Sequence, residues 1–285
     1  MNKEKYIEKS IFITTIFSVI IMILIIGFIF YESLPALKEI GLINFIIGSV
    51  WNPETEQFGV LPMIISTIIL VISTLIIAIP LSLSCSIFIT KYSNKHIKQI
   101  IIPALQTLTG IPSVVYGFFG LTVVSPIIGT FTGSQGFNFI TASIILSIMI
   151  MPTIITLSCD AINAIPKSYE ESSLALGATK WQTIKKVILP LASPGILTSI
   201  ILAIGRLIGE SIAVIMIAGN VAKIPSSITS PFRSLTSNIA LEMGYAINLH
   251  YDALFLTGTV LLFIIILLIA ITYRIKMNIE INGVV

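Results

Sequence analysis

Long apolar stretches without a charged side chain alternate with short polar segments along most of this sequence. A bilayer core about 30 Å thick needs roughly 20 helical residues to cross it, and helices satisfy their backbone hydrogen bonds without water. The pattern predicts six membrane-spanning helices at about 10–31, 62–84, 100–128, 139–160, 193–219 and 252–273. We therefore expect an all-α polytopic membrane protein.

The first apolar stretch follows a short basic segment with Lys3, Lys5 and Lys9, which resembles the start of a signal peptide. The stretch is longer than a signal peptide's apolar region, and no small-residue cleavage site follows it. We expect an uncleaved membrane anchor. We expect the chain to divide into three parts. Residues 1–60 comprise an N-terminal cytoplasmic segment, the first membrane helix and an external loop. Residues 61–275 form a core of five membrane helices, and residues 276–285 form a short cytoplasmic tail.

The third predicted span, at about 100–128, contains four residues that interrupt helices, namely Pro103, Gly110, Pro112 and Pro126. Proline lacks an amide donor and clashes with the preceding turn. We expect this span to be bent or partly unwound. Irregular backbone survives at membrane depth only where protein or a water-filled cavity surrounds it.

Composition excludes several classes of protein. Hydrophobic residues make up 55% of the chain, charged residues 10%, and the mean hydropathy is +1.04, whereas soluble domains carry about 25% charged residues. A formal charge of +3 is too small for a nucleic-acid surface, so no nucleic-acid partner is expected. Two cysteines, Cys85 and Cys159, and two histidines, His96 and His250, provide neither a disulfide framework nor a metal site nor a catalytic triad. We expect no catalytic residue, no metal and no cofactor.

Basic residues fix the expected orientation, because cytoplasmic loops are enriched in Lys and Arg. If the N-terminus is cytoplasmic, twelve basic residues lie inside: Lys3, Lys5, Lys9, Lys91, Lys95, Lys98, Lys167, Lys180, Lys185, Lys186, Arg274 and Lys276. Only Lys38, Lys223 and Arg233 lie outside. Both termini are therefore predicted to be cytoplasmic, in a multi-pass protein of the cell membrane.

The segment between the fourth and fifth spans is the most informative. Ser168 and Glu171 have the spacing of a capping box, which predicts the start of a short helix. Gly177 is expected to adopt a left-handed conformation that ends this helix. A short helix exposed beneath a membrane domain is a contact point for another protein.

This segment resembles the EAA signature of ABC-transporter permeases, E-A-A-x3-G-x9-I-x-L-P. The matching residues are Glu171, Gly177, Leu189 and Pro190. The departures, Ser172, Ser173 and Val187, keep small or apolar side chains. Further matches, at 51–53, 58–59, 110–117, 205–211, 219–220, 239–242 and 250–255, resemble the phosphate-specific ABC permeases of the PstC type.

The resemblance implies the type I importer permease fold and a coupling loop at about 166–190, where Glu170, Glu171 and Gly177 would contact the ATPase. It implies a sister permease, two ATP-binding subunits and an external phosphate-binding protein as partners, within a lipid bilayer. No glycine is followed by lysine, so the phosphate-binding loop G-x-x-x-x-G-K-[ST] is absent. We therefore expect a transport subunit that is not an enzyme, with ATP bound by the partner subunit.

Two charged residues, Arg206 and Glu210, fall inside the fifth predicted span, four positions apart, and are expected to share one helix face. Charges at membrane depth are costly and by default mark a pathway or a functional pair. Arg206 offers a planar set of donors to phosphate oxygens, and Glu210 either holds that group or accepts the phosphate hydroxyl proton. A purely structural ion pair is the alternative. Ser113 and Tyr116 are expected to line the same pathway, or to pack within a kinked helix.

Asp160, Glu242 and His250 are interpreted as interfacial or binding-protein contacts, and Lys180, Lys185 and Lys186 as anchors for lipid headgroups. The function that follows is the permease subunit of an ATP-driven phosphate importer. A sulfate or molybdate permease is the alternative, since those anions present similar oxygens. An ion-coupled secondary transporter has no use for the 168–190 segment, and a membrane-embedded enzyme lacks its reactive groups.

Overall fold

The computed structural model describes the backbone of residues 2–283 and the side chains of residues 7–277. Within them, six helical stretches are long and apolar enough to cross a membrane. They are Ile7–Ile40, Leu61–Tyr92, Ser113–Thr132, Phe139–Asn163, Lys180–Ile208 and Asn248–Met277. The six predicted spans and the all-α polytopic class are confirmed, although the predicted bounds of the third and fifth spans are wrong. The division of the chain at residues 60 and 275 stays a prediction.

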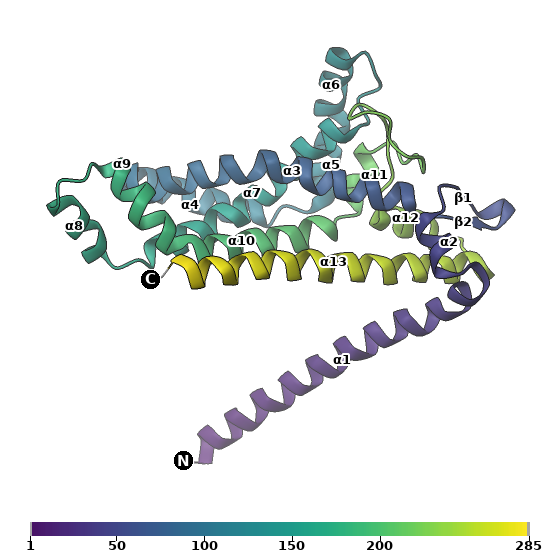
Figure 1. Cartoon of the computed structure of the whole chain (residues 1–285), viewed down its shortest axis with the longest axis horizontal. Helices are drawn as coiled ribbons and strands as arrows, with labels where there is room; N and C mark the ends of the chain where they lie inside the picture. The colour runs from purple at the N-terminus through teal and green to yellow at the C-terminus, as the bar shows by residue number, and fades with distance from the viewer. Residues whose placement is uncertain (1, 284–285) are drawn as a thin grey trace.

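The centre of the bundle is α7 (Phe139–Asn163), which packs between α3 (Leu61–Ile87) and α10 (Leu189–Ile208) (Figure 1). Asn138 begins α7 by accepting a hydrogen bond from the Thr141 amide at 3.1 Å, the usual role of an N-cap side chain. Apolar side chains of α7 fill the core, with Ala142, Ile145, Leu146, Met149, Ile150 and Ile154 fully buried. Burial of 61% of its most apolar window explains why apolar side chains occupy most sides of α7.

The third span differs from its predicted bounds. Residues 100–109 belong to α4 (Lys95–Thr109), a separate helix that lies along α7 and has no fully buried residue. The chain breaks over 110–112, because a residue before proline is disfavoured in the helical region and proline donates no amide. The crossing helix then starts at Ser113 and continues through α5 (Ser113–Phe119), the π-helical η3 (Gly120–Val124) and α6 (Ser125–Thr132).

The fifth span is also interrupted. The predicted helix over 193–219 is wrong at its outer end, because α10 stops at Ile208 and a new helix, α11 (Ile212–Ile217), begins four residues later. Gly209 caps α10, and Glu210 lies in the break. At its other end the span starts earlier than predicted, with α9 (Lys180–Thr183) and the π-helical η4 (Ile184–Ile188) continuous with α10.

One end of the bundle is closed by short elements: α2 (Leu42–Ile47), β1 (Trp51–Asn52), η1 (Pro53–Thr55), β2 (Gln57–Phe58) and α12 (Leu235–Glu242) (Figure 1). The two strands form an antiparallel hairpin in which Trp51 pairs with Phe58. The backbones at Gly48 and Gly59 touch, since a Cβ on Gly59 would lie 2.3 Å from the Gly48 carbonyl carbon. Only glycine permits this approach, which seats the hairpin against α2.

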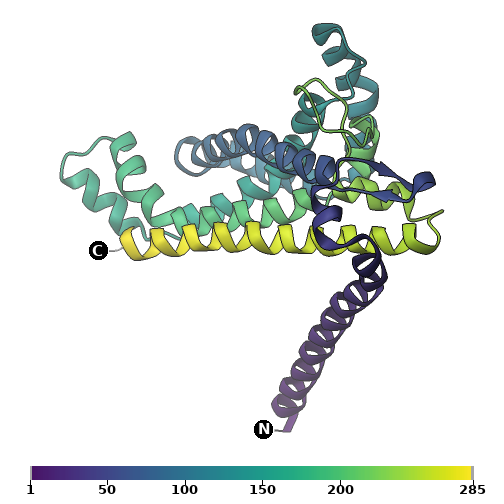
Figure 2. The ribbon, with the colours of Figure 1, turned by 45° about the vertical axis from the view of Figure 1, so that its right-hand side comes forward.

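The first helix, α1 (Asn2–Ile40), diverges from the bundle (Figure 2). None of its most apolar window is buried. It meets the last helix, α13 (Asn248–Gly283), through edge-to-face ring pairs, Phe28 with Phe255 and Phe30 with Phe263. The remaining short helix, α8 (Lys167–Ala175), lies at the opposite end of the bundle from α12 (Figure 1).

Candidate functional site

Arg206 lies in the last turn of α10, near the end of the candidate span Lys180–Ile208, and is half-buried. Its Nη1 donates to the Thr153 hydroxyl on α7 at 3.3 Å. Among residues 7–277, no carboxylate forms an ion pair with the guanidinium. One edge of the group is therefore anchored to α7, while its other donors remain available to an anion.

Glu210 occupies the break between α10 and α11. Its Oε1 accepts from the Ala213 amide at 3.0 Å, and its backbone carbonyl accepts from the Thr236 hydroxyl at 2.8 Å. A carboxylate is favourable here because the first amides of a helix are unsatisfied and its N-terminus is positive. The expectation that Arg206 and Glu210 share one uninterrupted helix face is wrong, because the helix ends between them. Their roles in the pathway stay predictions.

Tyr116 and Ser113 stand on the first turn of α5, beside the break at 110–112. The Tyr116 hydroxyl donates to the Leu108 carbonyl at 2.9 Å, which ties the two sides of the break together, and the ring lies within electrostatic range of Arg206. Next to it, a Cβ on Gly117 would come 2.7 Å from Met216 Sδ of α11. The two interrupted spans thus meet near their breaks, where α5 packs against α11.

A cluster of buried charge at the α12 end was missed by the sequence analysis. Glu242, 5% exposed, accepts from Trp51 Nε1 at 2.7 Å, contacts His250 Nε2 at 2.9 Å, and pairs with Arg233 at 2.5 Å. The interpretation of Glu242 and His250 as interfacial or binding-protein contacts does not fit their burial, at 5% and 8% exposed. Glu242 instead ties the hairpin, the segment before α12 and the start of α13 together. Partial burial first, and the Glu242 carboxylate second, raise the pKa of the Tyr245 phenol beside this cluster.

The predicted coupling loop contains a short helix, as expected, but its N-terminal signal was assigned to the wrong residue. α8 starts after Pro166 with no side-chain cap, so Ser168 is not the capping residue. The capping box is formed instead at α9, where Thr179 and Gln182 exchange bonds of 3.3 and 2.9 Å. Gly177 has φ +85°, which confirms the predicted left-handed conformation after α8.

Apolar side chains project from this loop. Tyr169, Leu174, Leu176 and Trp181 are exposed, Leu176 at 90%. Glu171 is also exposed, whereas Glu170 pairs with Lys91 of the π-helical turn η2 (Phe88–Tyr92) at 2.6 Å. Exposed apolar patches of this kind mark sites of protein contact. Whether Glu170, Glu171 and Gly177 couple to an ATPase stays a prediction.

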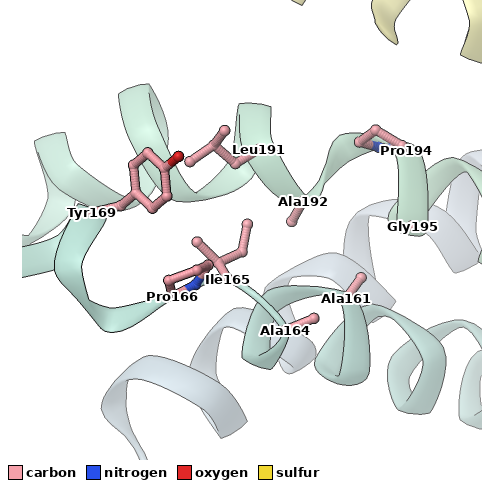
Figure 3. A pocket seen from close by; sticks show the side chains of 9 residues that line it. All are labelled: Ala161, Ala164, Ile165, Pro166, Tyr169, Leu191, Ala192, Pro194 and Gly195. Carbon is pink, nitrogen blue, oxygen red and sulfur yellow. The ribbon is translucent and has the colours of Figure 1, made fainter. Parts of the chain in front are cut away.

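An apolar cavity of about 430 Å³ lies between α8, the end of α7 and the start of α10 (Figure 3). Its lining residues are Ala161, Ala164, Ile165, Pro166, Tyr169, Leu191, Ala192, Pro194 and Gly195. The Tyr169 ring stands at the α8 side, opposite Pro194 and Gly195 (Figure 3). The cavity has no carboxylate or basic group in its lining, so no side chain there carries a charge that would attract an anion.

No group of three or more His, Cys, Asp or Glu side chains that could hold a metal occurs in the described part of the chain. The arrangement therefore offers an anchored guanidinium beside a helix break, which could bind an anion, and an exposed apolar loop at one end of the bundle, which could bind another protein.

Comparisons with known proteins agree with this architecture. The family model for the binding-protein-dependent transport system inner membrane component matches residues 78–277. A probable ABC transporter permease, YqgH of Bacillus subtilis, is 41% identical over 235 residues, covering 80% of this chain and 76% of the relative. The phosphate transport system permease proteins PstC of Mesorhizobium japonicum and Haemophilus influenzae are 33% and 32% identical, covering 88% and 93% of this chain and 83% and 91% of their own lengths.

Among solved structures, a bacterial ABC transporter involved in import of the acidic polysaccharide alginate aligns with a TM-score of 0.68 at 16% identity, over 97% of this chain and 96% of that chain. The likeness to a solved importer permease shows the type I importer permease fold. The chain belongs to the binding-protein-dependent transport system inner membrane components and, within them, to the permeases of the PstC type.

Proposed function

We propose that this chain is the permease subunit of an ATP-driven importer of phosphate. It forms the translocation pathway with a sister permease, binds two ATP-binding subunits through the coupling loop, and receives phosphate from an external binding protein. Both termini are cytoplasmic in the cell membrane. The chain binds no cofactor of its own and is not an enzyme, because ATP is hydrolysed on the partner subunits.

The observation that carries the proposal is the half-buried Arg206 at the breaks of two membrane spans. Its anchor on Thr153 occupies one donor at 3.3 Å. The remaining donors form a planar fork that suits two oxygens of a tetrahedral anion. Arg206 has no counter-ion among residues 7–277. A charge at membrane depth is costly and by default marks a functional site.

Glu210 supports phosphate over the alternative substrates. Its Oε1 caps α11, and among the described residues Oε2 has no hydrogen-bond partner. A carboxylate oxygen accepts hydrogen bonds and repels anions. It therefore favours an oxyanion that still carries a hydroxyl, as phosphate does at neutral pH, over fully ionised sulfate or molybdate.

The coupling loop explains how ATP drives the movement. Leu176 and the other exposed apolar side chains of this loop provide a surface that fits a groove on another protein. Movement of that partner shifts α8 as a rigid body and, through the continuous helix from α9 to α10, reaches Arg206. An ion-coupled secondary transporter needs no such surface.

Purification tests the assembly directly. The tagged chain, extracted from membranes in mild detergent, is expected to carry the sister permease and two ATP-binding subunits in native mass spectrometry. Leu176→Ser should lose the ATP-binding subunits and keep the sister permease. Recovery of the chain alone, or with an ATPase that Leu176→Ser does not release, would contradict the proposed assembly.

A further inference from the structure

The π-helical turn at the end of the second membrane span holds the coupling loop at two points. Lys91 Nζ lies 2.6 Å from Glu170 Oε2 on α8. Lys180, the first residue of α9, stands 4.5 Å above the centre of the Tyr92 ring. The two contacts fall on either side of Gly177, so η2 holds both arms of the loop.

The Lys91–Glu170 pair is more than a surface contact. Its side chains are 14% and 26% exposed, so solvent screens the attraction less than it screens an exposed pair. Within the described residues, Lys91 pairs with no carboxylate other than Glu170. The bond length is that of a charge-assisted hydrogen bond.

The neighbouring basic residues differ. Lys185 and Lys186 on η4 are exposed, and neither forms an ion pair in the described part of the chain. Lys98 donates to the Thr90 carbonyl at 3.1 Å, which holds α4 against η2 instead. The contacts with the coupling loop are therefore specific to Lys91 and Tyr92.

The location of these contacts creates a second mechanical path. The covalent path from α8 runs through α9 and η4 into α10. The η2 contacts lead from α8 and α9 into α3, which packs along α7 through polar bonds such as Ser73 to Ser143 at 2.6 Å. The two arms also touch each other, through Ser173 and Thr183 hydroxyls 2.9 Å apart, so the η2 contacts add a link from both arms to α3 that the loop itself does not provide.

We propose that Lys91 and Tyr92 are positioning residues that make the second span move together with the coupling loop. The proposal rests on the proposed function, since it assumes that α8 is moved by an ATPase. Lys91 fixes the angle of α8, and Tyr92 fixes the start of α9, so that one displacement reaches α3 and α10 at the same time.

A charge-reversal cycle on the complete complex in liposomes tests this. Lys91→Glu and Glu170→Lys should each lower uptake of radiolabelled phosphate per ATP hydrolysed by about tenfold, within the range of coupling between sites. The double reversal restores the opposite charges and should recover most of the loss, as interacting pairs do. Lys95→Glu, an exposed lysine four residues away, is the matched control and should behave as wild type.

The possible results distinguish failure of this proposal from failure of the proposed transport function. Wild-type complex without ATP-dependent phosphate uptake would refute the proposed function itself. If the wild-type complex is active and both single variants import as much phosphate per ATP as wild type, only the proposed role of Lys91 and Tyr92 is refuted. Failure of the double reversal to recover coupling would also refute it, because Glu170 would then act on the ATPase directly.

A second measurement does not depend on transport. Spin labels on Lys167→Cys and Phe88→Cys, both exposed, in a chain with Cys85→Ser and Cys159→Ser, report the distance between α8 and η2 in the detergent-purified complex. The neutral variant Lys91→Gln should broaden this distance distribution with and without ATP, while Lys95→Gln should not. An unchanged distribution in Lys91→Gln would overturn the proposal.

Discussion

Replacing Gly177 with alanine tests whether the turn after α8 transmits the movement. Gly177 has φ +85°, and a Cβ added there meets nothing within 4 Å. Steric conflict with neighbours is therefore excluded, and the backbone conformation alone sets the cost. The turn is held by the Gly177 amide on Leu174 O at 2.9 Å and the Ala178 amide on Ser173 O at 3.2 Å.

The size of the effect follows from this geometry. An L-residue in the left-handed region costs about 1–2 kcal/mol relative to glycine. That corresponds to a shift of roughly 5–30-fold toward a relaxed turn in which these two bonds are broken. Gly177→Asn should cost less, because asparagine tolerates this region, and Gly177→Asp adds a charge facing the partner surface.

Gly133 provides a matched control. It ends α6 with φ +64°, and its Cβ would also meet nothing within 4 Å, but it lies at the other end of the bundle (Figure 1). In liposomes containing the complete complex, Gly177→Ala should lower the phosphate imported per ATP hydrolysed, whereas Gly133→Ala should not. Equal ratios in both variants and wild type, or an equal fall in both, would refute the reasoning.

Three further predictions test the remaining parts of the molecule. Arg206→Gln should abolish phosphate uptake while the complex still assembles, and Arg206→Lys should support little uptake because its point charge lacks the planar donors of a guanidinium. Adding Glu210→Gln to Arg206→Gln should not restore uptake. Recovery of uptake in that double variant, measured beside the yield of complex, would assign both residues a structural role. Glu242→Ala should destabilise the chain by about 3–5 kcal/mol, since it leaves a buried partner charge uncompensated, and unchanged thermal stability of the purified chain would contradict this. Single cysteines at Gln135 and Lys95 should be labelled from opposite sides of intact cells by an impermeant reagent, and equal labelling from outside would contradict the orientation.

The sequence predicted the spans because hydropathy over about 20 residues is a strong local signal. It also predicted the conformation of Gly177, because a glycine just after a short helix commonly ends it in the left-handed region. The helix α8 lies where it was predicted, but the capping box inferred from Ser168 and Glu171 does not form. The capping box of this loop is at Thr179 and Gln182, where α9 begins.

The break in the third span was predicted from its prolines and Gly110, whereas the break in the fifth span escaped prediction for a physical reason. The break between Ile208 and Ile212 contains only three residues and has apolar helix on both sides, so hydropathy averaged over about 20 residues does not reveal it. The four-residue spacing of Arg206 and Glu210 also predicts a shared helix face. The Glu242 cluster was missed because its partners are distant in sequence: Trp51 lies 191 positions away. Such pairings are visible only once the helices are packed.

ATP-driven uptake by the purified complex, with its sister permease, ATP-binding subunits and binding protein in liposomes, tests the central claim most directly. Radiolabelled phosphate should accumulate only with ATP inside and the binding protein outside, and excess sulfate or molybdate should not compete. Uptake of sulfate or molybdate in place of phosphate, or phosphate uptake driven by an ion gradient without ATP, would contradict the central claim.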